Sequence, residues 1–154
     1  MIVVDTNVIC YRWISSPNNA AAETALAKDP HWIAPLLWRS EFRNIVALAI
    51  KKRTLTIDAA QDIMRKAEAS LDGSEFAVSS DAVLELAARS ACTAYDCEFV
   101  ALAQAEGVWL VTADRYIMRE FPEVAISLQK FVRDWNAAKE FRTDRFNICS
   151  HYVI

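Results

Sequence analysis

The sequence predicts an α/β protein in which a mainly parallel sheet is sandwiched between helical layers. Two observations carry this prediction: short apolar runs that suit buried parallel strands, and longer helical patterns that alternate with them. Strands are expected at residues 2–4, 31–34, 75–78, 108–111 and 124–126. Helices are expected at residues 6–14, 18–28, 36–52, 56–71, 80–89, 94–106 and 128–139.

Local signals mark several helix boundaries. Asparagine and serine cap helix N-termini, proline fits the first helical turn, and glycine ends a helix. The sequence places these residue types at Asn18, Ser80, Pro35 and Gly107. Because the chain has only two glycines and four prolines, we expect short connections and a hairpin formed by the helices at 36–52 and 56–71.

The chain is long enough for one domain. With 154 residues, of which 54% are apolar, it can bury a sizeable core without covalent cross-links. We assign residues 1–139 to this single domain and leave the tail at 140–154 unassigned. No basic, then apolar leader begins the chain, and no apolar run approaches the roughly 20 residues of a membrane span, so a cytoplasmic protein without membrane contact is expected.

The composition disfavours a strongly basic nucleic-acid binder and a zinc site. A net charge of -3 and a pI near 5.4 give no global positive field for nucleic acid, so an anionic substrate would need local basic residues. The cysteines form no Cys-x-x-Cys pair, and with only two histidines a zinc site has few ligands. We therefore expect reduced thiols at Cys10, Cys92, Cys97 and Cys149.

Two carboxylates follow predicted strands closely. Asp5 comes directly after the first strand, and Asp114 comes three residues after the strand at 108–111. Ligands of open α/β sheets bind outside the carboxyl ends of the strands, so both acids are expected at that edge. Each could alternatively serve only as an acid that starts a helix.

Glu41 lies on the apolar stripe of the helix at 36–52, where a charge needs a partner. Asn44, three residues later, could hydrogen-bond the same group as Glu41. A bound cation would offset the cost of desolvation more completely. The alternative is an ion pair with an arginine such as Arg39 or Arg43.

Asp96 repeats this pattern on the apolar face of the helix at 94–106. Here the alternative is a capping box, in which Thr93 caps the helix and Asp96 occupies its third position. Four carboxylates that converge in one pocket would repel one another unless cations neutralise them. Oxygen-rich clusters suit Mg²⁺ or Mn²⁺, and one or two such ions could activate water for attack on a phosphodiester.

Neighbouring polar side chains could support these acids. Thr6 and Asn7 could orient Asp5 or a water on the metal, and the Thr112 hydroxyl could hold Asp114 or a phosphate oxygen. Helix capping is an equally good explanation for the same side chains.

Four motifs occur in order along the chain: Val4-Asp5-Thr6-Asn7, Glu41 with Asn44, the run from Tyr95-Asp96-Cys97-Glu98 to Ala103, and Val111-Thr112-Ala113-Asp114. Together they resemble the PIN-domain family over residues 2–131. The compact length more narrowly resembles VapC-type toxins of bacterial and archaeal toxin–antitoxin systems. Glu98 departs from the small or hydroxyl residue often found there, and the tail after residue 139 lies outside the family pattern.

The resemblance implies a three-layer α/β/α fold and a Mg²⁺- or Mn²⁺-dependent endoribonuclease toxin. It implies that the catalytic and metal-binding acids are Asp5, Glu41, Asp96 and Asp114. It also implies a protein antitoxin that occludes the acidic site, commonly with a basic side chain, and a homodimer.

An acidic ribonuclease needs local positive charge for its RNA substrate. Arg39, Arg43 and the run from Lys51 to Arg53 are candidates, although such residues on an exposed helix usually only solvate it. Arg115, beside Asp114, is better placed to hold a phosphate.

Two other functions compete with the nuclease. In a haloacid-dehalogenase-like phosphatase Asp5 would be a covalent nucleophile, but that pattern needs a second acid two residues later, where Asn7 stands. A PIN-like fold could also act only as a catalytically silent binding module, against which the presence of all four acids argues.

Overall fold

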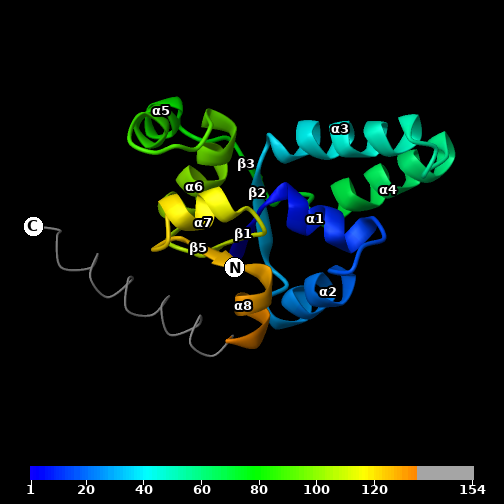
Figure 1. Ribbon diagram of the computed structural model, residues 1–154, viewed down its shortest axis with the longest axis horizontal. Helices are drawn as coiled ribbons and strands as arrows, with labels where there is room; N and C mark the ends of the chain where they lie inside the picture. Colours follow the sequence, from blue (N-terminus) through cyan, green and yellow to red (C-terminus); the bar gives the residue numbers. More distant parts are fainter. Residues whose placement is uncertain (135–154) are drawn as a thin grey trace, which may run out of the picture.

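The computed structural model describes residues 1–134, which form a five-stranded sheet with helices on both faces (Figure 1). The strands are β1 (Ile2–Val4), β2 (Trp32–Pro35), β3 (Glu75–Phe76), β4 (Leu110–Thr112) and β5 (Ala125–Ser127). Every pairing is parallel, in the order β3-β2-β1-β4-β5. The predicted parallel sheet is confirmed.

The helices form the two outer layers of an α/β/α sandwich. They are α1 (Thr6–Trp13), α2 (Asn19–Lys28), α3 (Trp38–Lys51), α4 (Ile57–Ser70), α5 (Ser80–Ala88), α6 (Ala94–Glu106), α7 (Arg115–Glu120) and α8 (Leu128–Arg133). α1, α2 and α8 pack on one side of the sheet and α5, α6 and α7 on the other, while the α3–α4 hairpin projects past the sheet beside α1 (Figure 1). The predicted three-layer fold and helical hairpin are confirmed.

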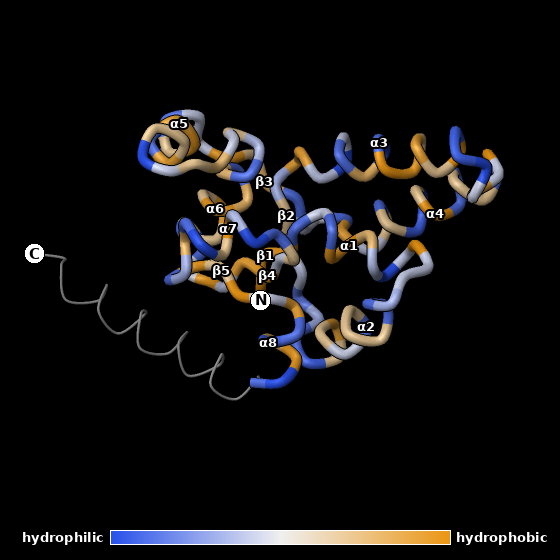
Figure 2. Tube along the Cα trace, in the orientation of Figure 1, coloured by the Kyte–Doolittle hydropathy of each residue, from blue (hydrophilic) through white to orange (hydrophobic). Residues whose placement is uncertain are grey.

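The core lies between these layers. All three residues of β1 and of β4 are buried, as expected for central strands covered by helices on both faces. Both strands run through the apolar centre of the molecule, whereas polar residues gather on the outer turns and alternate with apolar ones along the α3–α4 hairpin (Figure 2). Trp38, Phe42, Phe99 and Phe131 are the largest fully buried side chains. The thiols of Cys10, Cys92 and Cys97 are also buried and reduced.

Some predicted boundaries were wrong. Pro35 is the last residue of β2, paired with Phe76, and does not lie in the first turn of α3. The ladder continues from Leu36, whose N–H donates to the Phe76 carbonyl, so the helix begins only at Trp38. A proline is tolerated here because the donors to the β3 side are the flanking N–H groups of Ala34 and Leu36, so the pairing with β3 needs no N–H from Pro35.

Two predicted caps also differ. The Ser79 hydroxyl, not that of Ser80, accepts the capping hydrogen bond of α5, from the N–H of Ala82. Asn18 stands at the N-cap of α2 without a side-chain cap bond, and the Asn19 amide instead accepts from the N–H of Ser16. In both places adjacent residues of the same type compete for one position, which composition does not resolve.

The last predicted elements are only partly described. α8 ends at Arg133, so the expected continuation to residue 139 and the tail at 140–154, with Cys149, lie outside the described residues. None of the helices within residues 1–134 has the length and hydrophobicity of a membrane span.

Candidate active site

The acids lie where the order of the strands reverses. From β1 the chain proceeds to β2 and β3 on one side of the sheet, then returns to β4 on the other side of β1. The Asp5 N–H donates to the Val111 carbonyl at 3.0 Å, which holds the end of β1 against β4. Ligands bind at such a reversal point in open α/β sheets, and Asp5 lies there at the carboxyl end of β1, as the sequence predicts.

Asp5 is a buried carboxylate, only 7% exposed. Its Oδ2 accepts hydrogen bonds from Asn7 Nδ2 and from Thr112 Oγ1, each at 2.5 Å. The pKa of Asp5 is raised to about 6: burial raises it most and the nearby charge of Glu41 adds to this, while the hydrogen bonds from Thr112 and Asn7 lower it in part. Asp5 is therefore an acid held in an environment that disfavours its charge.

Glu41 reaches the site from the first turn of α3. Its Oε2 accepts from Thr6 Oγ1 at 2.5 Å, and Thr6 directly follows Asp5. Burial raises the pKa of Glu41, and the charges of Asp96 and Glu98 on α6 raise it further. α1, α3 and α6 thus bring three of the four predicted acids into electrostatic contact.

The alternatives considered for Glu41 are not what the structure shows. Asn44 is exposed on α3, and Thr6 supplies the hydrogen bond to Glu41. Arg39 binds Glu75 and Glu68, with a distance of 2.6 Å to each.

For Asp96 the capping box is present. Its Oδ2 accepts from the Thr93 N–H at 2.9 Å and from the Thr93 hydroxyl at 2.7 Å, while Thr93 caps the N–H of Asp96. The two interpretations are compatible, because Asp96 caps α6 and its charge still acts on Glu41.

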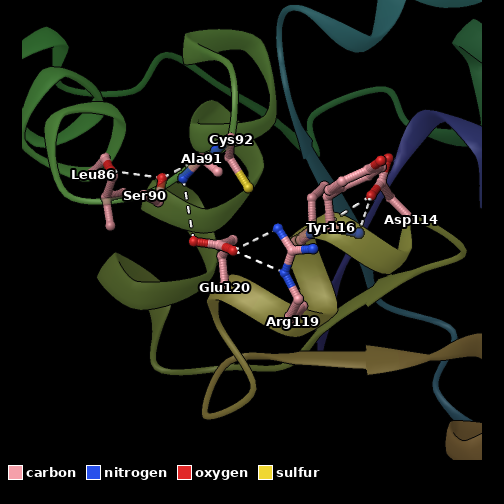
Figure 3. A network of polar contacts seen from close by, with 9 residues as sticks. Leu86, Ser90, Ala91, Cys92, Asp114, Tyr116, Arg119 and Glu120 are labelled. Carbon is pink, nitrogen blue, oxygen red and sulfur yellow. Dashed lines mark hydrogen bonds and ion pairs between the residues drawn. The ribbon is translucent and has the colours of Figure 1, made fainter.

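Asp114 caps α7, a helix that was not predicted from the sequence. Its Oδ1 accepts from the N–H groups of Tyr116 at 2.6 Å and Ile117 at 3.2 Å (Figure 3). The Asp114 N–H in turn donates to Thr112 Oγ1 at 2.9 Å. Since the same hydroxyl donates to Asp5, Thr112 connects the two acids that follow strands.

Two further contacts hold the frame of the site. Asn7 Oδ1 accepts from the Ala113 N–H at 3.1 Å, so this amide connects Asp5 to the turn after β4. At the far end of α7, Glu120 accepts from the Ala91 N–H at 3.2 Å and pairs with Arg119 at 2.9 Å (Figure 3). This contact attaches α7, which Asp114 caps, to the loop before α6, whose first turn carries Asp96.

The acids have no positive partner among residues 1–134, where no ion pair involves Asp5, Glu41, Asp96, Glu98 or Asp114. Within the same residues, no group of three or more acid, cysteine or histidine side chains is placed so that it could hold a metal ion. Mg²⁺ does not need such a group, because it keeps several waters and binds through one or two carboxylates. A divalent cation therefore fits the donor chemistry of this site.

A comparison with family models decides the relationship. The model of the PIN domain matches residues 2–125, most of the chain. The chain belongs to the PIN domain family. Membership favours the nuclease over the phosphatase interpretation, in which Asp5 would be a nucleophile.

The fold of this PIN domain is similar to a solved structure. The crystal structure of FitAcB from Neisseria gonorrhoeae aligns with a TM-score of 0.68 and 16% sequence identity, covering 84% of this chain and 99% of the other. At this identity the similarity concerns the fold alone. No curated protein sequence matches the chain.

The predicted RNA-binding residues differ in whether their charge is already paired within the protein. Arg39 is occupied by its two carboxylates, while Arg43 is exposed and donates to the Arg39 carbonyl at 2.9 Å. Arg115 is exposed and begins α7, directly after Asp114. The run from Lys51 to Arg53 is exposed at the opposite end of α3 from Glu41.

A pocket of about 480 Å³ close to the acids was not predicted from the sequence. Its walls come from Leu36 after β2, from the end of β3 and the segment that follows it, and from α5 and α6, and Glu98 is the charged residue that lines it. No local pattern could have indicated it, because its residues are far apart in the chain. Only the departure of Glu98 from the family motif pointed to this place.

Proposed function

We propose that this PIN domain is a metal-dependent endoribonuclease that hydrolyses RNA phosphodiesters and acts as the toxin of a toxin–antitoxin system. The observation that carries the proposal is Asp5, a buried carboxylate whose pKa is raised to about 6 beside Glu41, without a cation among the described residues to compensate it. Burying a carboxylate without a compensating cation costs free energy, and this cost is expected at a site that binds a divalent cation.

The acids that would hold Mg²⁺ or Mn²⁺, as one or two ions, are Asp5, Glu41, Asp96 and Asp114. When bound, such ions lower the pKa of water and offset the negative charge that develops on a phosphodiester. Thr6, Asn7 and Thr112 fix the carboxylates of Glu41 and Asp5 through the hydrogen bonds described above.

Arg115 and Arg43 are the proposed phosphate contacts. Both are exposed, and Arg115 adjoins an acid of the site. Arg39 contributes less to RNA binding in this proposal, because Glu68 and Glu75 already compensate its charge. Asn44, exposed on the helix of Glu41, is available to a substrate rather than to the acid.

Cleavage of RNA with and without metal tests the nuclease. We expect the intact protein to cut single-stranded RNA with Mg²⁺ or Mn²⁺, to stop in EDTA, and to lose at least roughly 100-fold in rate as Asp5→Asn. Asp58→Asn is the matched control, because Asp58 is an exposed acid in the first turn of α4. An active Asp5→Asn protein, or inactivity of the intact protein with every metal, contradicts the proposal.

The toxin role is tested in a living cell. Induction of the intact protein in a bacterium should arrest growth, and induction of Asp5→Asn to the same level should not. Co-expression of the short reading frame next to the gene should restore growth if it encodes the antitoxin that occludes the acids. Unimpaired growth at high levels of active nuclease contradicts the toxin role and leaves the nuclease standing.

Self-association is the last part of the proposal. Three apolar side chains of the α3–α4 hairpin are exposed at 36% to 55%: Ile45, Leu48 and Ile57. Exposed apolar surface of this kind is typical of interfaces, and we propose a homodimer. Light scattering after size-exclusion chromatography measures the mass directly, and a monomer at 100 μM would exclude the dimer.

A further inference from the structure

The pocket beside the acids opens at the same edge of the sheet as Asp5. Leu36 and Phe76 in its wall stand at the carboxyl ends of β2 and β3, as Asp5 does for β1. Glu98 lines the pocket and its charge also acts on Glu41, so the pocket lies close to the acids. A polymer that places one linkage at the acids therefore presents a neighbouring unit to this pocket.

The lining combines an aromatic ring, aliphatic side chains and the Ser80 hydroxyl with a single charge. Phe76 is half-buried, Val83 is 8% exposed, and Leu36 and Leu84 are exposed at 52% and 63% at the rim. Unpaired RNA bases bind proteins by stacking on aromatic and apolar side chains and by hydrogen bonds along their edges. A volume of about 480 Å³ is within the range of pockets that enclose small ligands.

Glu98 limits which base the pocket would accept. An ionised carboxylate offers two acceptor oxygens and no donor. Guanine carries two adjacent donors on its Watson–Crick edge, N1–H and the N2 amino group. Adenine, cytosine and uracil each place at least one acceptor beside their single donor group, which would face a carboxylate oxygen.

We propose that this pocket binds an unpaired guanine next to the cleaved linkage, with Glu98 as the specificity-determining residue. The proposal rests on the proposed ribonuclease function and names the base that it selects. The Glu98 carboxylate accepts from guanine N1–H and N2–H, and the base stacks on Phe76 between the apolar walls.

Mapping of cut positions tests the pocket apart from the nuclease. A single-stranded RNA that contains every dinucleotide step is cleaved with Mn²⁺, and rates at steps with guanine at a given position are divided by rates at the other steps. We expect the intact protein to prefer guanine at one position by roughly 5- to 150-fold, the discrimination of a bidentate contact. Because the readout is a ratio within one RNA, a general loss of activity cancels.

Changes in the protein and in the RNA provide the controls. Glu98→Gln should reduce the ratio at least about fivefold, while Glu106→Gln, at the other end of α6, should not. In the intact protein, inosine in place of guanosine removes the N2 amino group and should also lower the rate. Cleavage without base preference, or an unchanged ratio in Glu98→Gln, overturns the pocket proposal and leaves the nuclease intact.

A binding measurement covers the case in which no RNA is cut. Guanosine, titrated into the intact protein in EDTA, should shift the amide signals of residues 76–84 in two-dimensional NMR spectra, and adenosine should shift them less. Equal shifts with both nucleosides, or none, overturn the proposal independently of activity. It is also overturned if Leu84→Asp turns a dimer into a monomer with the base preference unchanged, because the pocket would then belong to the dimer interface.

Discussion

The Thr112 hydroxyl has two roles that depend on each other. It accepts from the Asp114 N–H at 2.9 Å, which directs its own proton toward Asp5 Oδ2. The same hydroxyl is one of the groups that lower the pKa of Asp5 against the effect of burial. One side chain at the end of β4 therefore orients both acids that follow strands.

Thr112→Val removes this hydroxyl and keeps the shape of the side chain. We expect the pKa of Asp5 to rise above about 6 and the free energy of unfolding to fall by about 1–3 kcal/mol, because Asp5 Oδ2 keeps only the Asn7 donor and the Asp114 N–H loses its acceptor. Carboxyl-carbon NMR titration and urea denaturation measure these effects. The control is Thr24→Val, at an exposed threonine that donates to the carbonyl of Ala20. Equal destabilisation by both changes would contradict the assigned role.

Asp5 also predicts how stability depends on pH. Its pKa is about 6 in the folded protein against 3.8 ordinarily, so between these values the folded state holds a proton that the unfolded state has released. Stability therefore decreases as pH rises from about 4 to 6 and stays lower above that range. Asp5→Asn removes this cost, because an amide oxygen can accept both hydrogen bonds of Asp5.

In EDTA we expect Asp5→Asn to be more stable than the intact protein at pH 7.5, by about 3 kcal/mol at most, and equal to it near pH 4. Urea denaturation of both proteins at both pH values measures this difference in the free energy of unfolding, in which the contributions of other titrating groups cancel. A destabilised variant at pH 7.5 would show that the Asp5 charge is compensated.

At the scale of elements, capping and catalysis overlap in the same carboxylates. Asp96 completes the capping box of α6, and Asp114 caps α7. The sequence left both roles open, since Asp96 stands third in a helix capped by Thr93 and Asp114 starts a helix after a strand. What it could not show was their coexistence, because the distance from Asp96 to Glu41 depends on how α3 and α6 pack.

Two substitutions of Asp114 separate the roles. Asparagine caps helices as well as aspartate does, so Asp114→Asn should change the free energy of unfolding by less than about 0.5 kcal/mol. Asp114→Ala should lose about 1 kcal/mol with the cap. Both should lose RNA cleavage, because neither offers a carboxylate. Urea denaturation and the RNA-cleavage assay measure the two effects on the same proteins. Activity retained in Asp114→Asn would mean that Asp114 only caps α7.

For the whole molecule, features set by residues close together in the sequence were predictable, and features set by contacts between distant segments were not. Alternation of apolar runs with helical patterns was sufficient for the parallel sheet, because each run must be covered on both faces. The position of Asp5 at the sheet edge followed from its place after β1. The pocket with Glu98 and the engagement of Arg39 with Glu68 and Glu75 were not predictable, since they depend on contacts between distant segments.

A bound cation should stabilise the whole fold, because the cost of burying the acids is distributed over β1, β4, α3 and α6. A ligand present at 100 times its dissociation constant adds about 2.7 kcal/mol, which for a domain of this size raises Tm by roughly 5–10 °C. We expect Mn²⁺ at pH 7.5 to raise the Tm of the intact protein in differential scanning calorimetry, and to raise that of Asp5→Asn much less. Sodium chloride at equal ionic strength is the control for screening of the acids. Equal shifts in both proteins would place the cation elsewhere, and no shift at millimolar Mn²⁺ would remove the physical basis for a metal-dependent site.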